Sequence, residues 1–188
     1  ESIDRVIAGP ERKSRVMSPR NKEITAYHEA GHGLVAWLLP HADPVHKISI
    51  VARGSMGGYT RLLPEEDRYL WTRNQFESML ATTMGGRVAE KLTFDEVTTG
   101  ASNDLEKATQ ISLKMIKQYG MSDLLGPRTF GRREEMVFLG RTLSEERDYG
   151  DKIAEEIDCE VRRLIQEAYD QATKLLVDNK GKLKEIAE

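Results

Sequence analysis

Residues 19–38 have the sequence PRNKEITAYHEAGHGLVAWL, and this stretch predicts the central helix of the fold. Ser18 is a residue type that caps helices, Pro19 suits the first helical position, and Pro40 ends the pattern. Between them, one stripe of residues recurs at helical spacing: Ile24, Tyr27, Gly31, Leu34, Val35 and Leu38. We therefore expect a largely apolar helix that ends before Pro40.

This helix contains the pattern H-E-x-x-H, as His28-Glu29-Ala30-Gly31-His32. Residues four apart on a helix differ by only about 40° around its axis, so both imidazoles project from one face. Glu29 lies about 100° from His28, where its carboxylate can take a proton from a water molecule without binding the ion. The pattern predicts a metallopeptidase site with His28 and His32 as zinc ligands and Glu29 as general base.

A catalytic zinc takes three protein ligands, so a third must come from elsewhere in the chain. His41 and His46 follow the helix beside two prolines, and we expect them to be ordinary loop residues. Glu90, near the end of a second predicted helix, could bind the ion or support a histidine. Asp104 opens a third predicted helix behind small and polar residues, although it could merely complement the helix dipole. The residue types favour Asp104 over Glu90 and leave both open.

Two short segments rich in β-branched residues, 45–51 and 58–63, predict strands. Glycines in segment 53–57 predict the turn between them, so a small antiparallel sheet follows. The exposed edge of the second strand, at Gly57, Gly58, Tyr59 and Thr60, could pair main chain to main chain with an extended substrate. An edge strand without a partner is an equally good interpretation of the sequence alone.

The remaining apolar patterns are helical. A capping box formed by Thr72 and Gln75 opens the second helix, and the third, near Asp104, runs towards Gly120. Segment 126–140 is expected to be loop. One long amphipathic helix ends before Gly181, and its apolar positions are Ile153, Ile157, Val161, Leu164, Ile165, Ala168, Ala172, Leu175 and Leu176. The predicted fold class is therefore mainly α, with a small antiparallel sheet and a long C-terminal helix.

Composition narrows the function further. The chain has 188 residues, 31% of them charged, and a net charge of -3, with no basic block that would indicate nucleic-acid binding. Its single cysteine, Cys159, excludes an intramolecular disulfide and is predicted to be a small buried residue. We find neither a long apolar run typical of a membrane span nor a signal peptide. Residues 1–17 are expected to be a linker or the tail of an upstream module, and 18–188 a single metalloprotease domain.

On these residues, the chain resembles the peptidase domain of the FtsH family of ATP-dependent zinc metalloproteases. Blocks similar to those of the family occur in the same order at 28–32, 38–47, 57–60, 62–67, 85–87 and 98–105. The resemblance implies that Asp104 is the third zinc ligand and that Glu90 lies behind a ligand histidine.

The resemblance also implies partners and a location. Proteins of this family form rings of six, degrade unfolded and membrane proteins, and are fed by an ATPase module, whose junction resembles residues 2–17. The intact protein would be anchored in a membrane with this domain on the cytoplasmic side, or in the matrix or stroma of an organelle. The chain has no G-x-x-x-x-G-K-[ST] loop, so we expect ATP to be bound by the upstream module.

Two alternatives remain on sequence grounds. A deformylase-like metallohydrolase would need a cysteine ligand upstream in a glycine-rich segment. Cys159 lies far downstream, which disfavours this alternative. A non-catalytic helical assembly module with an accidental H-E-x-x-H would contain no metal.

Overall fold

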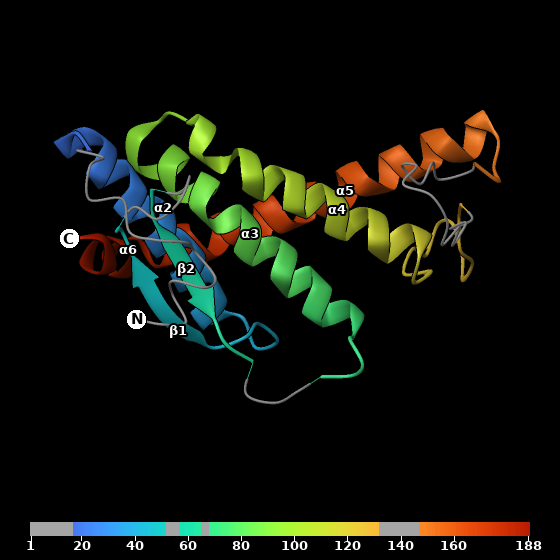
Figure 1. Ribbon diagram of the computed structural model, residues 1–188, viewed down its shortest axis with the longest axis horizontal. Coiled ribbons are helices and arrows are strands. Elements are labelled where there is room, and N and C mark those ends of the chain that lie inside the picture. Colours follow the sequence, from blue (N-terminus) through green and yellow to red (C-terminus); the bar gives the residue numbers. More distant parts are fainter. Residues whose placement is uncertain (1–16, 52–56, 65–67, 132–146) are drawn as a thin grey trace, which may run out of the picture.

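The computed structural model describes residues 17–51, 57–64, 68–131 and 147–188. These residues form the helices α2 (Pro19–Leu38), α3 (Arg73–Phe94), η1 (Thr99–Ala101), α4 (Ser102–Lys117), α5 (Asp151–Asp178) and α6 (Lys180–Ala187), and the strands β1 (Val45–Ser49) and β2 (Tyr59–Leu62) (Figure 1). The predicted class, mainly α with a small antiparallel sheet and a long C-terminal helix, is confirmed. Residues 1–16 lie outside the described part, so the division at residue 17 stays a prediction.

Helices α2 and α3 cross in backbone contact at the centre of the molecule. A Cβ atom on Gly85 would lie 2.7 Å from the carbonyl oxygen of Gly31, so neither position has room for a side chain. Ala30 and Ala89, fully buried beside this crossing, continue the contact between small residues. The close approach brings the two histidines of α2 within reach of α3.

The start of each of these two helices follows from its capping residue. Ser18 accepts a hydrogen bond from the backbone N–H of Asn21 at 3.1 Å, with Pro19 in the first turn. The predicted capping box at Thr72 and Gln75 is confirmed, since each side chain bonds the backbone N–H of the other.

The strands that the structure describes form one antiparallel pair, in which Ile48 lies opposite Thr60. Both strands are shorter than predicted by one or two residues at their ends, and the turn expected at 53–57 lies largely outside the described residues. The sheet packs on α2, where the Ile48 side chain fills the space that a side chain at Gly33 would need. This packing places β2 beside the motif helix.

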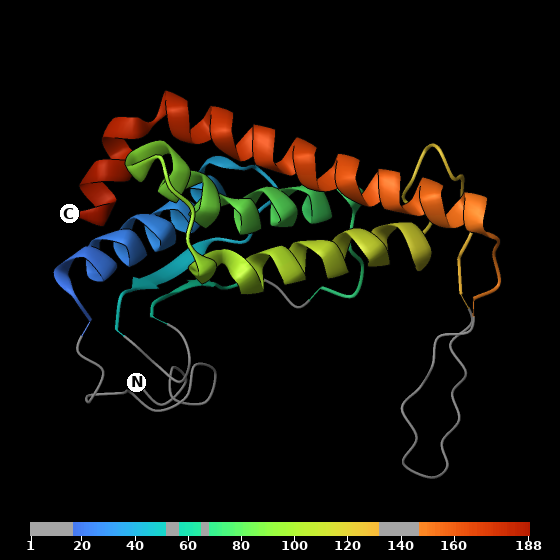
Figure 2. The same cartoon turned by 90° about the horizontal axis from the view of Figure 1, so that it is seen from above.

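Helix α5 runs along α3 and α4 (Figure 2) and closes the core against them. Its buried apolar residues recur every three or four positions: Ile157, Val161, Leu164, Ala168, Ala172 and Leu176. Helix α5 ends at Asp178, before Gly181 as predicted. The sequence did not predict α6, which begins at Lys180 and contains Gly181. Burial of Leu183 (2% exposed) in the core outweighs the roughly 1 kcal/mol that glycine costs in this second helix.

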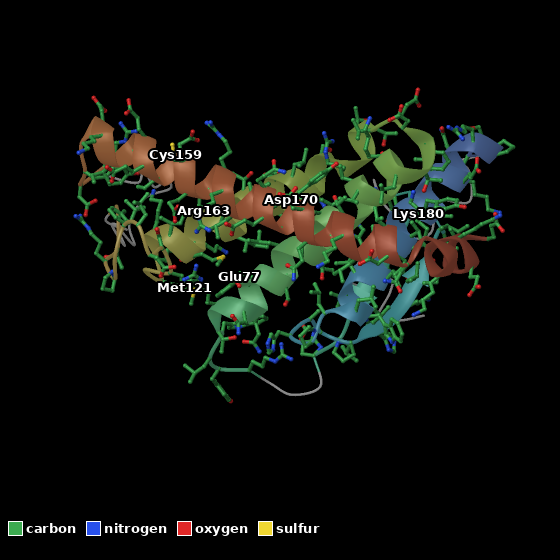
Figure 3. All side chains as sticks on the ribbon, turned by 180° about the vertical axis from the view of Figure 1, so that it is seen from behind. Glu77, Met121, Cys159, Arg163, Asp170 and Lys180 are labelled. Carbon is green, nitrogen blue, oxygen red and sulfur yellow. The ribbon has the colours of Figure 1, made fainter. Side chains whose placement is uncertain are left out.

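The prediction that Cys159 is buried is wrong. Cys159 is exposed, and Figure 3 shows it on the outer side of α5. Ile157 and Val161 face the core, and a residue two positions from each lies about 200° around the helix, on the solvent side. The segment predicted as loop from 126 onward has no helix or strand as far as residue 131, and 132–146 lie outside the described residues.

Candidate metal centre

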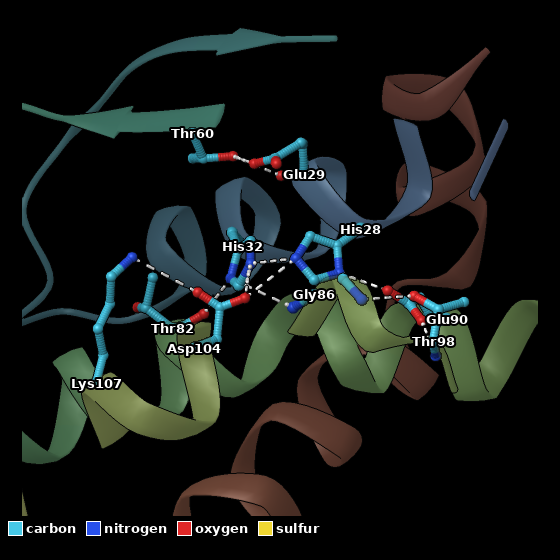
Figure 4. Close-up of polar contacts among 11 residues, drawn as sticks. His28, Glu29, His32, Thr60, Thr82, Gly86, Glu90, Thr98, Asp104 and Lys107 are labelled. Atoms are coloured by element: carbon cyan, nitrogen blue, oxygen red, sulfur yellow. Dashed lines mark hydrogen bonds and ion pairs between the residues drawn. The ribbon is translucent and has the colours of Figure 1, made fainter. Parts of the chain in front are cut away.

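The two histidines of α2 converge on one point, as their spacing predicts. The Nε2 atoms of His28 and His32 lie 3.0 Å apart, and both side chains are buried. Figure 4 shows both rings pointing from α2 towards α3 and α4. Each ring is held by a hydrogen bond through its other nitrogen.

These second hydrogen bonds assign the tautomer of each ring. Nδ1 of His28 lies 2.7 Å from Oε1 of Glu90, and Nδ1 of His32 lies 2.8 Å from the carbonyl oxygen of Thr82. A carbonyl oxygen and an ionised carboxylate only accept hydrogen bonds, so Nδ1 is the donor in both of these short contacts. For His32, the 2.8 Å contact with the Thr82 carbonyl outweighs the longer 3.3 Å contact between the Gly86 N–H and the same Nδ1 atom. Each Nε2 atom is therefore the one that can present a lone pair to a metal ion at the point of convergence.

Asp104 completes the group from the first turn of α4. Its Oδ2 atom lies 3.2 Å from Nε2 of His28 and 3.4 Å from Nε2 of His32. Its other oxygen, Oδ1, lies 3.7 Å from Nζ of the exposed Lys107. The structure thus brings Asp104 to the side of the rings on which the Nε2 atoms lie.

Glu90 lies on the opposite side of the His28 ring and joins it to the segment that leads to Asp104. Its Oε1 atom accepts the hydrogen bond from His28, and its Oε2 atom accepts one from the backbone N–H of Thr98 at 2.8 Å. The Thr98 hydroxyl in turn accepts from the N–H of Gly100 and caps η1, which runs into α4. One buried carboxylate therefore orients a histidine and anchors the start of the helix that carries Asp104.

Gly86 of α3 leaves the room that both rings occupy. A Cβ atom there would lie 2.5 Å from Nε2 of His32 and 2.6 Å from Nε2 of His28, closer than atoms in contact allow. The absence of a side chain at this position is therefore a condition for the convergence of the rings.

The carboxylates around His28 and His32 favour a positive charge at the point where the two rings converge. Burial opposes ionisation of His28, but hydrogen bonds to Asp104 and Glu90 and the nearby charge of Glu29 outweigh it and raise the His28 pKa from 6.5 to about 9. Burial likewise opposes ionisation of Asp104 and Glu90. Hydrogen bonds to His28 and His32 nevertheless hold the pKa of Asp104 below its usual range, and those from His28 and the Thr98 N–H do so for Glu90. Without a metal, a proton on His28 supplies this charge.

The donor atoms also fit a metal ion in kind and in spacing. Zinc with ligand bonds of about 2.0 to 2.2 Å in a tetrahedron separates its ligand atoms by about 3.4 Å. The triangle of His28, His32 and Asp104 has sides of 3.0, 3.2 and 3.4 Å. Two imidazole nitrogens and one carboxylate oxygen suit zinc and related first-row ions.

Glu29 emerges from α2 on the side that faces the sheet. Its buried carboxylate accepts a hydrogen bond from the Thr60 hydroxyl of β2, with Oγ1 and Oε2 2.8 Å apart (Figure 4). Its charge contributes to the raised pKa of His28, so Glu29 lies within electrostatic range of the convergence point. This arrangement leaves Glu29 outside the donor triangle, as the helical spacing predicts.

The predicted substrate segment lies beside Glu29. Gly57 and Gly58 precede β2, while Tyr59 and Thr60 are its first two residues. Within the described part of the chain, β2 pairs only with β1, so its second edge has no strand partner there. His41 and His46 are exposed and take no part in the donor triangle, although His46 lies in β1 instead of a loop.

Comparison with known proteins agrees with a metallopeptidase site. Residues 15–188 match the profile of Peptidase family M41. The chain belongs to this family. It is 63% identical to the ATP-dependent zinc metalloprotease FtsH 1 of Thermomicrobium roseum and to that of Sphaerobacter thermophilus, with all of this chain and 29% of each relative covered. FtsH of Rubrobacter xylanophilus is 54% identical over the same share. The predicted FtsH family and peptidase class are confirmed, and nothing here supports the non-catalytic alternative.

The M41 chain spans less than a third of the length of these relatives. In the part of it that the structure describes, no helix has both the length and the apolarity that crossing a membrane requires.

Several contacts of the M41 site were missed by sequence reasoning. The Thr82 carbonyl that orients His32 is a backbone group, so no residue type marks it. The sequence does mark Gly86, since a pair of glycines inside a predicted helix indicates that another part of the chain packs closely there. It does not show which part that is. The bonds from Thr60 to Glu29 and from Thr98 to Glu90 join segments that only the fold brings together.

Proposed function

We propose that this chain is a zinc-dependent endopeptidase domain, with His28, His32 and Asp104 as the metal ligands and Glu29 as the general base. The observation that carries the proposal is the triangle of three donor atoms with sides of 3.0 to 3.4 Å, beside a buried glutamate. The family and the names of the relatives support the chemistry.

Each residue has a distinct role in this proposal. When bound, zinc would activate a water molecule and stabilise the negative charge that develops on the substrate carbonyl. Glu29 takes the proton of the attacking water and can pass it to the leaving amine. Glu90 fixes the ring of His28 by its hydrogen bond to Nδ1, and the Thr82 carbonyl does the same for His32.

The substrate would be an extended polypeptide bound along β2. Gly57, Gly58, Tyr59 and Thr60 present an edge whose main-chain groups can pair with those of a peptide. Such pairing depends little on the side chains of the substrate. It therefore suits the degradation of unfolded and membrane proteins of varied sequence.

The intact protein would be an ATP-dependent protease, since the relatives that carry this domain are named so. Residues 1–17 would join an upstream ATPase module to the peptidase domain at 18–188, and ATP would act in that module. We further propose a homo-hexamer that is membrane-anchored, with the peptidase domain on the cytoplasmic side, or in the matrix or stroma of an organelle.

Cleavage of a fluorescently labelled unfolded casein by the zinc-loaded protein tests the proposed function. Glu29→Gln should retain zinc and lose cleavage, because the amide keeps the shape of the side chain but takes up no proton. Cleavage by this variant at the wild-type rate would contradict the assignment of Glu29 as base.

A further inference from the structure

The side of β2 that faces α2 lies directly over Glu29. Successive residues of a strand point to opposite faces, so positions 58 and 60 share the face towards the helix. A Cβ atom at Gly58 would lie 2.9 Å from Cγ of Glu29, so only a glycine allows the strand to come this close. The next position on the same face, Thr60, bonds the polar end of the same glutamate.

The Thr60 hydroxyl has two acceptors, both on Glu29. Oγ1 lies 2.8 Å from the carboxylate oxygen Oε2 and 2.9 Å from the main-chain carbonyl oxygen. A hydroxyl has one proton to donate, and an ionised carboxylate is the stronger acceptor. Within the described residues, no other hydrogen bond reaches this carboxylate, so Oε1 is left for a water molecule or substrate (Figure 4).

We propose that Thr60 is a positioning residue for the general base: its hydroxyl holds one oxygen of Glu29 and leaves the other available to take the proton of the attacking water. The inference rests on the proposed function. A free glutamate side chain samples several rotamers, and one hydrogen bond from a rigid strand removes much of that freedom before substrate arrives. Because Thr60 belongs to the strand proposed to bind substrate, one residue links peptide binding to the base.

The kinetic test replaces Thr60 by valine in the full-length, zinc-loaded protein, with labelled unfolded casein as substrate. Valine has the shape and β-branching of threonine, so the strand and its backbone edge are kept. We expect kcat to fall by about 10- to 100-fold, with KM within about twofold and zinc per chain unchanged. Thr60→Ser should restore kcat towards the wild-type value, because it restores the hydroxyl.

A matched control removes a threonine hydroxyl far from the site. Thr173 of α5 donates to the carbonyl oxygen of Tyr169 at 2.8 Å, and Thr173→Val should leave kcat and KM unchanged. A Thr60→Val enzyme with wild-type kcat, a change confined to KM, or a serine variant as slow as the valine variant would each overturn the inference.

A second measurement needs neither metal nor substrate. In the chelator-treated protein, Thr60→Val should lower the thermal midpoint, and the drop should be clearly smaller when Glu29 is already alanine. Equal drops in the two backgrounds would overturn the contact. Wild-type protein that holds zinc and cleaves no substrate would overturn the proposed function and the catalytic role of Glu29. The thermal midpoints would still decide, separately, whether Thr60 holds the Glu29 carboxylate.

Discussion

Nδ1 of His28 lies 2.7 Å from Oε1 of Glu90, and this bond turns Nε2 of the same ring towards Asp104. Because Oε2 of Glu90 also holds the backbone N–H of Thr98, the same carboxylate positions two of the three proposed ligands. The donor triangle is thus supported from behind by a residue that does not belong to it.

Glu90→Gln should weaken zinc binding without abolishing it. The amide can keep one of the two hydrogen bonds but carries no charge, and changes of this kind behind a metal ligand cost about 10- to 100-fold in affinity. Competition with a chromogenic zinc chelator measures the dissociation constant. Glu160→Gln is a matched control, since Glu160 is also buried but bonds Ser122 and Arg163 on the far side of the core. Equal zinc affinity in the Glu90 variant and the wild type would contradict its role.

Gly86→Ala should make the protein lose its bound zinc. The new methyl group would lie 2.5 Å from Nε2 of His32, so one ring or α3 must move. On helix propensity alone, replacing glycine by alanine stabilises a helix by up to about 1 kcal/mol. A Gly86→Ala protein that is less stable and binds zinc more weakly would therefore show that the clash with the rings outweighs this gain. Zinc titration and thermal unfolding measure both effects.

Gly181→Ala provides the control for that substitution. Nothing lies within 4 Å of a Cβ atom at Gly181, and α6 should gain stability with zinc affinity unchanged. If Gly86→Ala behaved like Gly181→Ala, the close packing of the two rings on α3 would be wrong.

The metal-free protein should become less stable as the pH rises from about 6.5 to about 9. The folded-state pKa of His28 is raised from 6.5 to about 9, so its contribution is fully present below pH 6.5 and is lost as the pH rises through 9. Asp104 and Glu90, whose pKa values are lowered, stay ionised throughout this range. At 1.36 kcal/mol per pKa unit, the loss is on the order of a few kcal/mol.

Urea unfolding of the chelator-treated protein at several pH values measures this dependence. His28→Gln should flatten it, because the titrating group is gone. Zinc competes with the same proton, so zinc affinity should rise over the range in which the metal-free protein loses stability. A metal-free wild type with the same unfolding free energy at pH 6.5 and pH 9 would contradict the assignment.

The sequence predicts the parts of the site that lie within one helix. His28, Glu29 and His32 owe their relative directions to helical spacing, and the N-terminal caps of α2 and α3 follow from local residue types. Asp104 is different, because its approach depends on how α4 packs against two other helices. Residue types alone left Glu90 as its rival, and the family resemblance favoured Asp104.

Other features depend on packing that no local pattern encodes. The Thr82 carbonyl and the Thr60 hydroxyl reach the site only because α3 and β2 lie beside α2. Helix α5 ends before Gly181, as predicted, but burial of Leu183 stabilises a further short helix, α6, that contains this glycine. Cys159 was expected inside on residue type, whereas its phase on α5 places it outside.

Metal content per chain, measured by plasma emission on purified protein, tests the three-ligand site most directly. We expect about one zinc per wild-type chain and its loss in Asp104→Ala. Glu90→Ala should retain the metal at saturating zinc, and so should the control Asp158→Ala, which removes an exposed carboxylate of α5. Zinc lost from Glu90→Ala but kept in Asp104→Ala, or no zinc in the wild type after loading, would contradict the three-ligand site.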